Sequence, residues 1–361
     1  MEGMLTELKS AIGANTISEI LSQPATWTTC LQAMDKSAEL RLLAHNLPRN
    51  IEWVFIGCGS SFYLAQSAAA SWFILTGEKS RAIPASEIML FPQLLPVPCQ
   101  PVMITRSGHT SEILQAARYL EGVLNLKVLA ITCGTDTPIE ELSSHHIILH
   151  AADEKSTVMT RSFTSMLIVL QSLAAIRGDH PDFLAGLHKL PEQFAARLGQ
   201  FQTTVKSLVE SGTFADYVFL GQGPFFGIAQ ESMLKVKEMS CSYAQSFHTL
   251  EFRHGPKAIV SPETLITFII SETAFDAEVA VLEEIKALGG TTLAVANTCS
   301  TAIRKAADYT VELSLDIPEV ARAAASVIAG QFLGFYTGLK KGLNPDEPRN
   351  LSRVVTLESR S

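Results

Sequence analysis

An internal repeat limits the folds open to this chain more than any other feature of its sequence. Residues 54–66 read VFIGCGSSFYLAQ and residues 218–230 read VFLGQGPFFGIAQ, so seven of thirteen positions are identical at an offset of 164. The same offset aligns the Leu-Ala pair within 128–133 with the pair within 292–297. Self-similarity at a fixed offset indicates that one structural unit is used twice. The sequence therefore predicts two consecutive units with a common architecture.

The length and composition of the chain agree with two globular domains. It has 361 residues, of which 47% are hydrophobic and 18% charged, so it can bury large cores and is not disordered. At roughly 100 to 200 residues per domain, this length predicts two domains. We expect an N-terminal helical segment at 1–45, a first domain at 46–190, a connecting helix and second domain at 191–341, and a C-terminal tail at 342–361.

Short apolar runs alternate with stretches of helical periodicity in both units. The expected strands are 53–56, 81–84, 102–105, 128–132 and 147–149 in the first unit, and 217–220, 265–270, 292–296 and 310–313 in the second. Such alternation is typical of a parallel sheet with helices on both faces. The predicted fold class is α/β, with two tandem doubly wound, flavodoxin-like parallel sheets and flanking helices.

Charge and cysteine spacing exclude several classes of partner and site. The chain has 28 basic and 36 acidic side chains, a net charge of −8, which disfavours nucleic acid and acidic membranes as partners. No two of its six cysteines form a CxxC pair, and His145-His146 has no third ligand at a suitable spacing, so no metal is expected. An N-terminus without a signal sequence and the lack of an 18-residue apolar run predict a cytoplasmic protein with no membrane span.

Two hydroxyl-rich turns, at 57–61 and 104–110, each follow an expected strand and enter a helix. Backbone N–H groups at the start of a helix bind anions, and turns at the carboxyl ends of strands in one sheet face the same crevice. Hydroxyls and amides satisfy the oxygens of a phosphate monoester without a metal. The candidate binding residues are Ser60, Ser61, Thr105, Arg106, Ser107 and Thr110. Neither a triphosphate-binding nor a dinucleotide-binding glycine motif is present, so no cofactor is predicted.

The helix expected at 228–243 carries Glu231, Lys235 and Glu238 at i, i+4 and i+7, which places all three on one face. Past this helix, the turn EFRHGPK at 251–257 carries a histidine, His254. A carboxylate and an imidazole near a phosphate pocket are suited to proton transfer at a sugar carbon. The alternative interpretation is a solvated helix face with ordinary salt bridges.

These motifs together resemble the tandem sugar isomerase (SIS) domain family, and specifically the isomerase half of glucosamine-6-phosphate synthase. The matching stretches are GCGSS at 57–61, TRSGHT at 105–110, ESMLKVKEMS at 231–240, EFRHGPKAIV at 251–260 and PRNLSRVVTLE at 348–358. They extend over nearly the whole chain. The resemblance implies two SIS domains with the C-terminal tail over the active site.

The resemblance also implies roles for individual residues. Ser61, Ser107 and Thr110 of this chain would bind the sugar phosphate. Glu238 would be the base that moves a proton between C1 and C2. His254 would assist ring opening, and in relatives this histidine comes from a neighbouring subunit, which implies a homodimer. Lys235 would keep Glu238 ionised or orient O1 of the sugar, and Glu231 would support it.

Three departures from the synthase change the expected reaction. The chain begins directly with the isomerase region, without a glutaminase. Arg353 stands where the synthase has a lysine that forms an imine, and a guanidinium stays protonated and cannot do so. Thr105-Arg106 replaces a Ser-Gln pair and is expected to hold the phosphate, or an anionic substituent, more tightly. A substrate that already carries nitrogen needs neither a glutaminase to supply ammonia nor a lysine to form the imine.

We therefore predict an isomerase/deaminase that acts on glucosamine- or galactosamine-6-phosphate and releases ammonia and a ketose phosphate. Two alternatives stay open at this point. One is a deglycase that cleaves a phosphorylated Amadori compound of the fructosamine-6-phosphate type. The other is a non-catalytic phosphosugar-binding regulator, which the lack of a DNA-binding pattern before the first strand disfavours.

Overall fold

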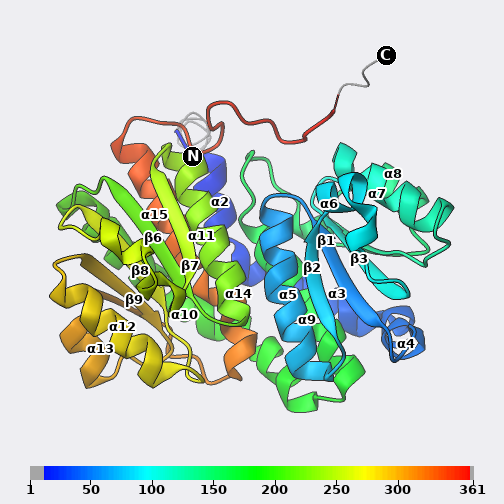
Figure 1. The fold of residues 1–361 in the computed structure, drawn as a ribbon, viewed down its shortest axis with the longest axis horizontal. Coiled ribbons are helices and arrows are strands. Elements are labelled where there is room, and N and C mark those ends of the chain that lie inside the picture. The colour runs from blue at the N-terminus through cyan, green and yellow to red at the C-terminus, as the bar shows by residue number, and fades with distance from the viewer. Residues whose placement is uncertain (1–11, 358–361) are drawn as a thin grey trace, which may run out of the picture. The chain divides into compact units, whose positions relative to one another are not determined.

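The computed structural model describes residues 12–357, which form two compact units, each built around its own sheet (Figure 1). The first-sheet unit comprises residues 25–154, 161–188 and 352–357, and the second-sheet unit comprises 12–24, 155–160 and 189–351. Part of the N-terminal segment expected to be helical, residues 1–11, lies outside the described residues. No helix in the described part of the chain is long and apolar enough to span a membrane.

The first-sheet unit contains five parallel strands in the order β2-β1-β3-β4-β5. Their bounds are Glu52–Gly57 (β1), Ser80–Pro84 (β2), Cys99–Thr105 (β3), Leu129–Thr132 (β4) and His145–Ile148 (β5). The chain reverses its direction across the sheet between β1 and β3. The loops that follow these two strands therefore open on one crevice at the carboxyl edge of the sheet.

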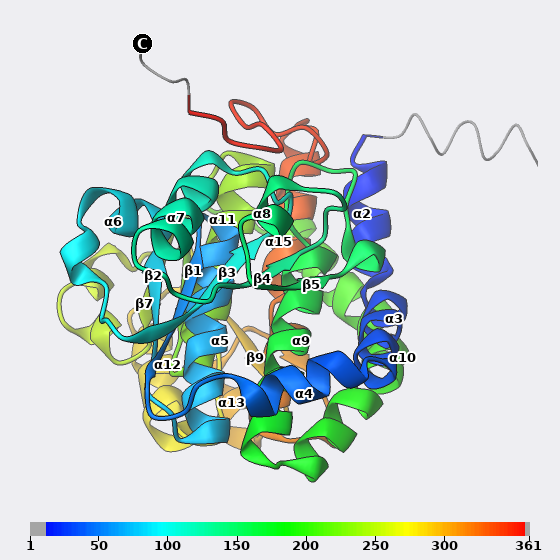
Figure 2. The same ribbon diagram turned by 90° about the vertical axis from the view of Figure 1, so that its right-hand side faces the viewer.

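Helices cover both faces of this sheet, because the side chains of β1 alternate between two apolar layers. Val54 and Ile56 pack into a buried cluster with α7, while Trp53 lies against Trp72 of α5, with ring centroids 3.9 Å apart. Figure 2 shows α6, α7 and α8 close together in this unit. The helices are Gln23–Lys36 (α3), Ala38–Asn46 (α4), Ser60–Thr76 (α5), Ala85–Leu90 (α6), Ser111–Gly122 (α7), Pro138–Glu141 (α8) and Arg161–Gly178 (α9), with 3-10 turns at Pro92–Leu94 and His150–Ala152.

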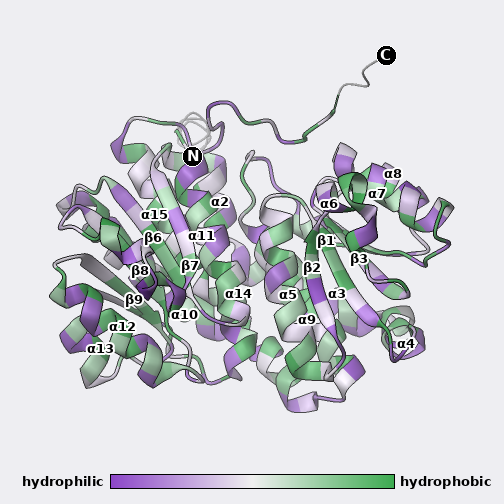
Figure 3. Ribbon diagram, viewed as in Figure 1, coloured by the Kyte–Doolittle hydropathy of each residue, from purple (hydrophilic) through white to green (hydrophobic). Residues whose placement is uncertain are grey.

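The second-sheet unit has the same design, with parallel strands in the order β10-β9-β8-β6-β7. The strands are Asp216–Gly221 (β6), Tyr243–His248 (β7), Thr264–Ile269 (β8), Thr291–Ala296 (β9) and Tyr309–Glu312 (β10). The helices are Ala14–Leu21 (α2), Pro181–Ser211 (α10, which begins in the first-sheet unit), Pro224–Ser240 (α11), Phe275–Ala287 (α12), Thr301–Ala306 (α13), Ala323–Ser326 (α14) and Ile328–Lys340 (α15), with 3-10 turns at Glu251–Arg253, Pro256–Ile259 and Glu319–Arg322. Figure 3 shows hydrophobic residues along most strands of each sheet. The predicted fold class, α/β with two doubly wound parallel sheets, is confirmed.

The repeated sequence forms the same strand, turn and helix in each unit. β1 and β6 begin and end 164 residues apart, and so do α5 and α11. The glycine that precedes each helix has nearly the same conformation, with φ and ψ of 55° and −126° at Gly59 and of 54° and −129° at Gly223. A positive φ of this kind strains residues that have a Cβ. The shared offset of the sequence therefore corresponds to a shared local structure.

Two sequence expectations about element boundaries were wrong. The helix expected at 228–243 ends at Ser240, because Cys241 adopts a left-handed conformation with φ 49°, and the edge strand β7 follows. The connecting helix, expected within the segment that starts at residue 191, begins earlier, at Pro181, and continues through Pro191. Its apolar positions repeat at helical spacing on both sides of this proline and are buried, so tertiary packing outweighs the cost of the proline.

Candidate active site

The turn after β1 in the first-sheet unit presents backbone N–H groups at the start of the 17-residue helix α5. Gly57 allows the chain to fold back closely, since a Cβ here would lie 2.4 Å from the carbonyl carbon of Ser61. Ser60 and Ser61, the first two residues of α5, are only 6% and 5% exposed. The dipole of a helix makes its N-terminus favourable for an anion.

The turn after β3 is held in shape by its own hydroxyl groups. The Gly108 N–H donates to Oγ1 of Thr105 over 3.2 Å, and the His109 N–H donates to Oγ of Ser107 over the same distance. Each hydroxyl still has its own hydrogen to donate to another acceptor. Thr110, the last residue before α7, does not cap that helix with its side chain. The loop therefore offers hydroxyl donors at a helix start, as a phosphate monoester requires.

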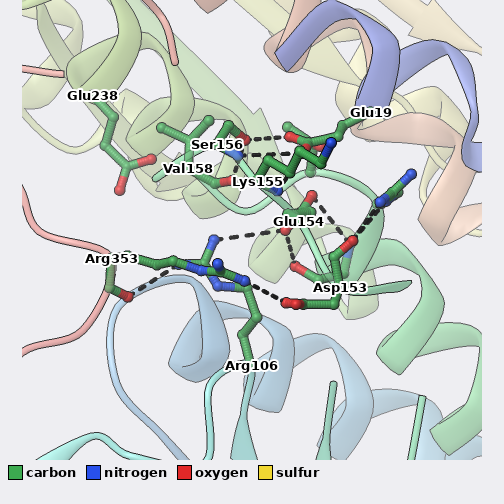
Figure 4. A network of polar contacts seen from close by, with 12 residues as sticks. Glu19, Arg106, Asp153, Glu154, Lys155, Ser156, Val158, Glu238 and Arg353 are labelled. Carbon is green, nitrogen blue, oxygen red and sulfur yellow. Dashed lines mark hydrogen bonds and ion pairs between the residues drawn. The ribbon is translucent and has the colours of Figure 1, made fainter. Parts of the chain in front are cut away.

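Arg106, expected among the phosphate ligands, has partners within the first-sheet unit (Figure 4). Its side chain is 6% exposed, Nη1 lies 3.7 Å from Oε2 of Glu154, and Nη2 donates to the backbone carbonyl of Arg353 over 3.0 Å. Glu154 has no exposed side-chain surface and also accepts from the N–H and hydroxyl of Ser162. A contact between Arg106 and a phosphate stays a prediction.

The described C-terminal residues bind to the same loop region. Arg353 Nη2 lies 2.6 Å from Oδ1 of Asp153, with both side chains more than 40% exposed (Figure 4). The Ser111 N–H donates to the carbonyl of Val355 over 3.2 Å, and the Leu357 N–H donates to Oγ of Ser111 over 3.0 Å. Residues 353–357 are thus attached to the start of α7, next to Thr110.

The three charged residues expected on one helix face lie together on α11 in the second-sheet unit. Nζ of Lys235 is 3.1 Å from Oε1 of Glu231 and 2.5 Å from Oε2 of Glu238. The side chains of Glu231 and Lys235 have no exposed surface, whereas that of Glu238 is 18% exposed. The alternative interpretation, a solvated helix face, is therefore wrong.

The charge state of this cluster follows from its partners. Burial alone would lower the pKa of Lys235, but the adjacent carboxylates of Glu231 and Glu238 outweigh it, and the pKa is raised. The lysine is therefore an ammonium that orients two carboxylates. Glu238 is the member of the cluster whose side chain reaches solvent, so it is the one that can accept a proton from a substrate.

Glycines on α15 allow this helix to pack closely against α11. A Cβ at Gly334 would lie 2.5 Å from the carbonyl oxygen of Lys235, and one at Gly330 would lie 2.3 Å from the Cβ of Ser232. The backbones of α11 and α15 therefore approach closely, side by side in Figure 1. A side chain at either position would clash with α11 and force the two helices apart.

The loop with His254 is fixed on both sides of the histidine. Nε of Arg253 donates to Oε2 of Glu284 over 2.7 Å, and Nζ of Lys257 donates to Oε1 of Glu284 over 2.5 Å. Hydrogen bonds from Lys257 and Arg253 lower the pKa of Glu284. His254 itself is exposed, and the following Gly255 has φ 112°. Glu284 on α12 thus anchors the loop while the imidazole stays accessible.

Comparison with known proteins agrees with this geometry. The family model of the SIS domain matches residues 50–176 and 216–335. The chain belongs to the SIS domain family. Each matched segment contains one of the two sheets of this SIS protein.

Named relatives of this SIS protein include synthases and phosphosugar enzymes. It is 26% identical over 306 residues to glutamine–fructose-6-phosphate aminotransferase of Methanothermobacter thermautotrophicus, which covers 84% of this chain and 51% of that protein. The chain thus spans about half the length of the curated relatives it matches. The structure of glucosamine-6-phosphate deaminase from Thermotoga maritima matches with a TM-score of 0.77 and 26% identity, over 95% of this chain and 100% of that chain. Tagatose-6-phosphate ketose/aldose isomerase from Escherichia coli shares the fold, with a TM-score of 0.82 and 23% identity over 97% and 99% of the two chains.

Several polar contacts within the two units of this SIS protein have no signal in a local motif. Asp153 and Glu154 hold Arg353 and Arg106, and in the second-sheet unit Glu19 accepts from the N–H groups of Lys155 and Ser156. These partners are distant in sequence, so spacing rules do not find them. Among residues 12–357, no group of three or more His, Cys, Asp or Glu is arranged to hold a metal ion.

Cys58, in the turn that follows β1 of the SIS protein, is expected to be inert to thiol reagents. Burial, together with the charge of Glu112, raises the pKa of Cys58 to about 12, so almost no thiolate forms at pH 8. Cys241 is exposed and should react first. Iodoacetamide labelling at pH 8 followed by peptide mass spectrometry checks this expectation. Labelling of Cys58 as fast as Cys241 would contradict it.

Proposed function

We propose that this protein is a phosphosugar isomerase/deaminase that converts an amino-sugar 6-phosphate of the gluco or galacto type into a ketose phosphate and ammonia. The observation that carries the proposal is the cluster on α11, in which a buried ammonium holds a partly exposed carboxylate, Glu238. A fixed, ionised carboxylate is the group needed to remove a proton from carbon. The match to a glucosamine-6-phosphate deaminase over that protein's whole length supports it.

The phosphate is held by the turns after β1 and β3. Hydroxyls of Ser61, Ser107 and Thr110 donate to its oxygens, and the amides at the starts of α5 and α7 add further donors. This binding fixes the sugar by an end that does not react. The reaction itself takes place at C1 and C2, the carbons on which the acid–base groups act in this proposal.

Proton transfer between C2 and C1 releases the nitrogen. With His254 assisting ring opening to the C1 aldehyde, Glu238 removes the C2 proton and the electron pair forms a C1–C2 double bond. The π electrons of the C1 carbonyl move to O1, which becomes a hydroxyl by taking up one proton, while the ammonium group on C2 loses one. Return of the proton to C1 leaves a protonated imine at C2, which water hydrolyses to the ketone and ammonia. Because the substrate supplies the imine nitrogen, no lysine is needed, and Arg353 remains a cation held by Asp153.

Substrate specificity is tested directly by a panel of three compounds. The protein is incubated with glucosamine-6-phosphate, galactosamine-6-phosphate and fructoselysine-6-phosphate, and ammonia, free lysine and ketose phosphate are assayed. Ammonia from an amino sugar supports the proposal. Lysine from the third compound alone would establish the deglycase instead, and binding without turnover of any of them would indicate a regulator.

The proposal includes a homodimer in which His254 of each chain serves the site of the other. An exposed imidazole on an anchored loop is available to a neighbouring chain. Glu238→Gln and His254→Ala are each expected to be inactive, but their mixture should regain about a quarter of the wild-type rate, because half of the dimers are mixed and each holds one intact site. Subunits are exchanged in mild denaturant and the rate of ammonia release is measured. If the mixture stays inactive although mass spectrometry detects mixed dimers, His254 acts within its own chain.

A further inference from the structure

The loop after β8, residues 270–274, is the counterpart at offset 164 of the first-sheet loop 106–110. Each loop follows a strand at the place where the strand order of its sheet reverses, with β3 beside β1 and β8 beside β6. Among residues 12–357, no hydrogen bond joins the hydroxyl of Ser107 or Thr110 to a carboxylate. The hydroxyl groups of Ser107 and Thr110 can therefore donate to a ligand.

The carboxylate of Glu319, in the same unit, accepts hydrogen bonds from loop 270–274. Oε1 of Glu319 accepts from the N–H of Glu272 over 2.5 Å and from the N–H of Thr273 over 3.1 Å. Oε2 of Glu319 accepts from the hydroxyl of Thr273 over 2.5 Å. Two adjacent amides and a hydroxyl around two anionic oxygens are the arrangement that binds one edge of a phosphate.

A second carboxylate takes the remaining donors. Glu278, which is 1% exposed, accepts with Oε2 from both the N–H and the hydroxyl of Ser271, each over 2.7 Å. Oγ of Ser271 in turn accepts from the N–H of Ala274 over 3.0 Å. The amides from Ser271 to Ala274 therefore all have acceptors within the second-sheet unit.

Further polar contacts fill the space beside this arrangement, part of which is exposed to solvent. Arg322, with a side chain 5% exposed, makes a two-pronged contact with Glu272 at 2.7 and 2.6 Å. The cavity that these residues line with Asn297 and Glu319 measures about 10 Å³, which holds at most one water molecule. A phosphate cannot enter while Glu319 occupies the loop.

We propose that loop 270–274 is an oxyanion site whose native occupant is the carboxylate of Glu319. Loop 270–274 keeps the anion-binding geometry of the repeated turn, and the anion is a carboxylate of the same chain. One consequence, which rests on the proposed function, is that each chain binds one sugar phosphate and not two. Removal of the Glu319 carboxylate should turn the loop into a site for inorganic phosphate.

The test uses Glu319→Ala in a Ser107→Ala background, which weakens phosphate binding by the first loop, and the Ser107→Ala parent is the reference for whatever binding remains there. The melting temperature should fall by about 2–6 °C, and millimolar inorganic phosphate should restore it, since a ligand of the folded state stabilises it by mass action. Glu319→Gln keeps an oxygen acceptor in the loop and should show no phosphate response. Glu283→Ala, an exposed carboxylate on α12, is the matched control for a general loss of charge.

The proposal is overturned if Glu319→Ala gains no more stability from phosphate than its Ser107→Ala parent. Should Glu319→Ala fail to fold, hydrogen exchange on the wild-type protein replaces it. The amides of Glu272 and Thr273 should then exchange much more slowly than in an unstructured peptide, and exchange at the peptide rate would overturn the proposal. Neither measurement uses a sugar substrate, so its outcome is independent of the proposed function.

Discussion

Replacement of Glu238 by glutamine is expected to lower the turnover of an amino-sugar 6-phosphate by about 10²–10⁴-fold, the range for loss of a positioned general base. The amide has nearly the shape of the carboxylate but cannot accept the C2 proton. Substrate affinity should change little, because the proposed phosphate contacts come from residues of the first-sheet unit. The fall should therefore be in kcat and not in KM.

The rate of ammonia release and calorimetric binding of the substrate measure these two quantities separately. Glu283→Gln, which changes an exposed carboxylate on α12, should retain wild-type kinetics. Near-normal turnover by Glu238→Gln would show that another group is the base. A large loss of affinity would mean instead that Glu238 contributes to ground-state binding.

Replacement of Lys235 by methionine is expected to cause the largest loss of stability of any single change discussed. Methionine fills a similar volume, but Glu231 is then left as a carboxylate in a dry interior with no exposed surface. Removal of one partner from a buried ion pair costs about 3–5 kcal/mol of unfolding free energy. Urea unfolding followed by circular dichroism measures the change.

Two companion variants separate this electrostatic effect from lost packing. Lys237→Met, two residues further along α11 and exposed, should leave stability within about 0.5 kcal/mol of wild type. Glu231→Gln added to Lys235→Met should recover part of the loss, because it removes the buried uncompensated charge. If the double variant is less stable than Lys235→Met, then packing and not charge determines the effect.

The sequence was sufficient for elements whose own residues carry a strong pattern. Nine strands were predicted from apolar runs, and all nine are present with bounds shifted by a few residues. β7 was missed because YAQSFH has little apolar character and only Ala244 of the strand is buried. An edge strand of this kind depends on its pairing with β6, which no local pattern reveals.

For the candidate site, the sequence predicted which residues share a helix face but not their surroundings. Helical spacing alone places Glu231, Lys235 and Glu238 on one face. The close packing of α11 against α15 involves Gly334, which lies about a hundred residues away in sequence and meets the backbone of Lys235 only in the folded chain. The same reason explains why Asp153, the partner of Arg353 across 200 residues, had no sequence signal. Local spacing defines candidate groups, and tertiary contacts determine their environment.

The first-sheet unit is discontinuous in sequence, and this sets the order in which a nascent chain can complete it. Its sheet is made from residues before 154, yet the bonds to Ser111 and to the guanidinium of Arg106 come from residues 353–357. Chains are synthesised from the N-terminus, and domains generally fold as they emerge. The loop after β3 and the start of α7 must therefore persist without these bonds until the second-sheet unit has been translated. During synthesis this loop should reach its final set of hydrogen bonds only after the second-sheet unit has been made, although its own residues are translated earlier.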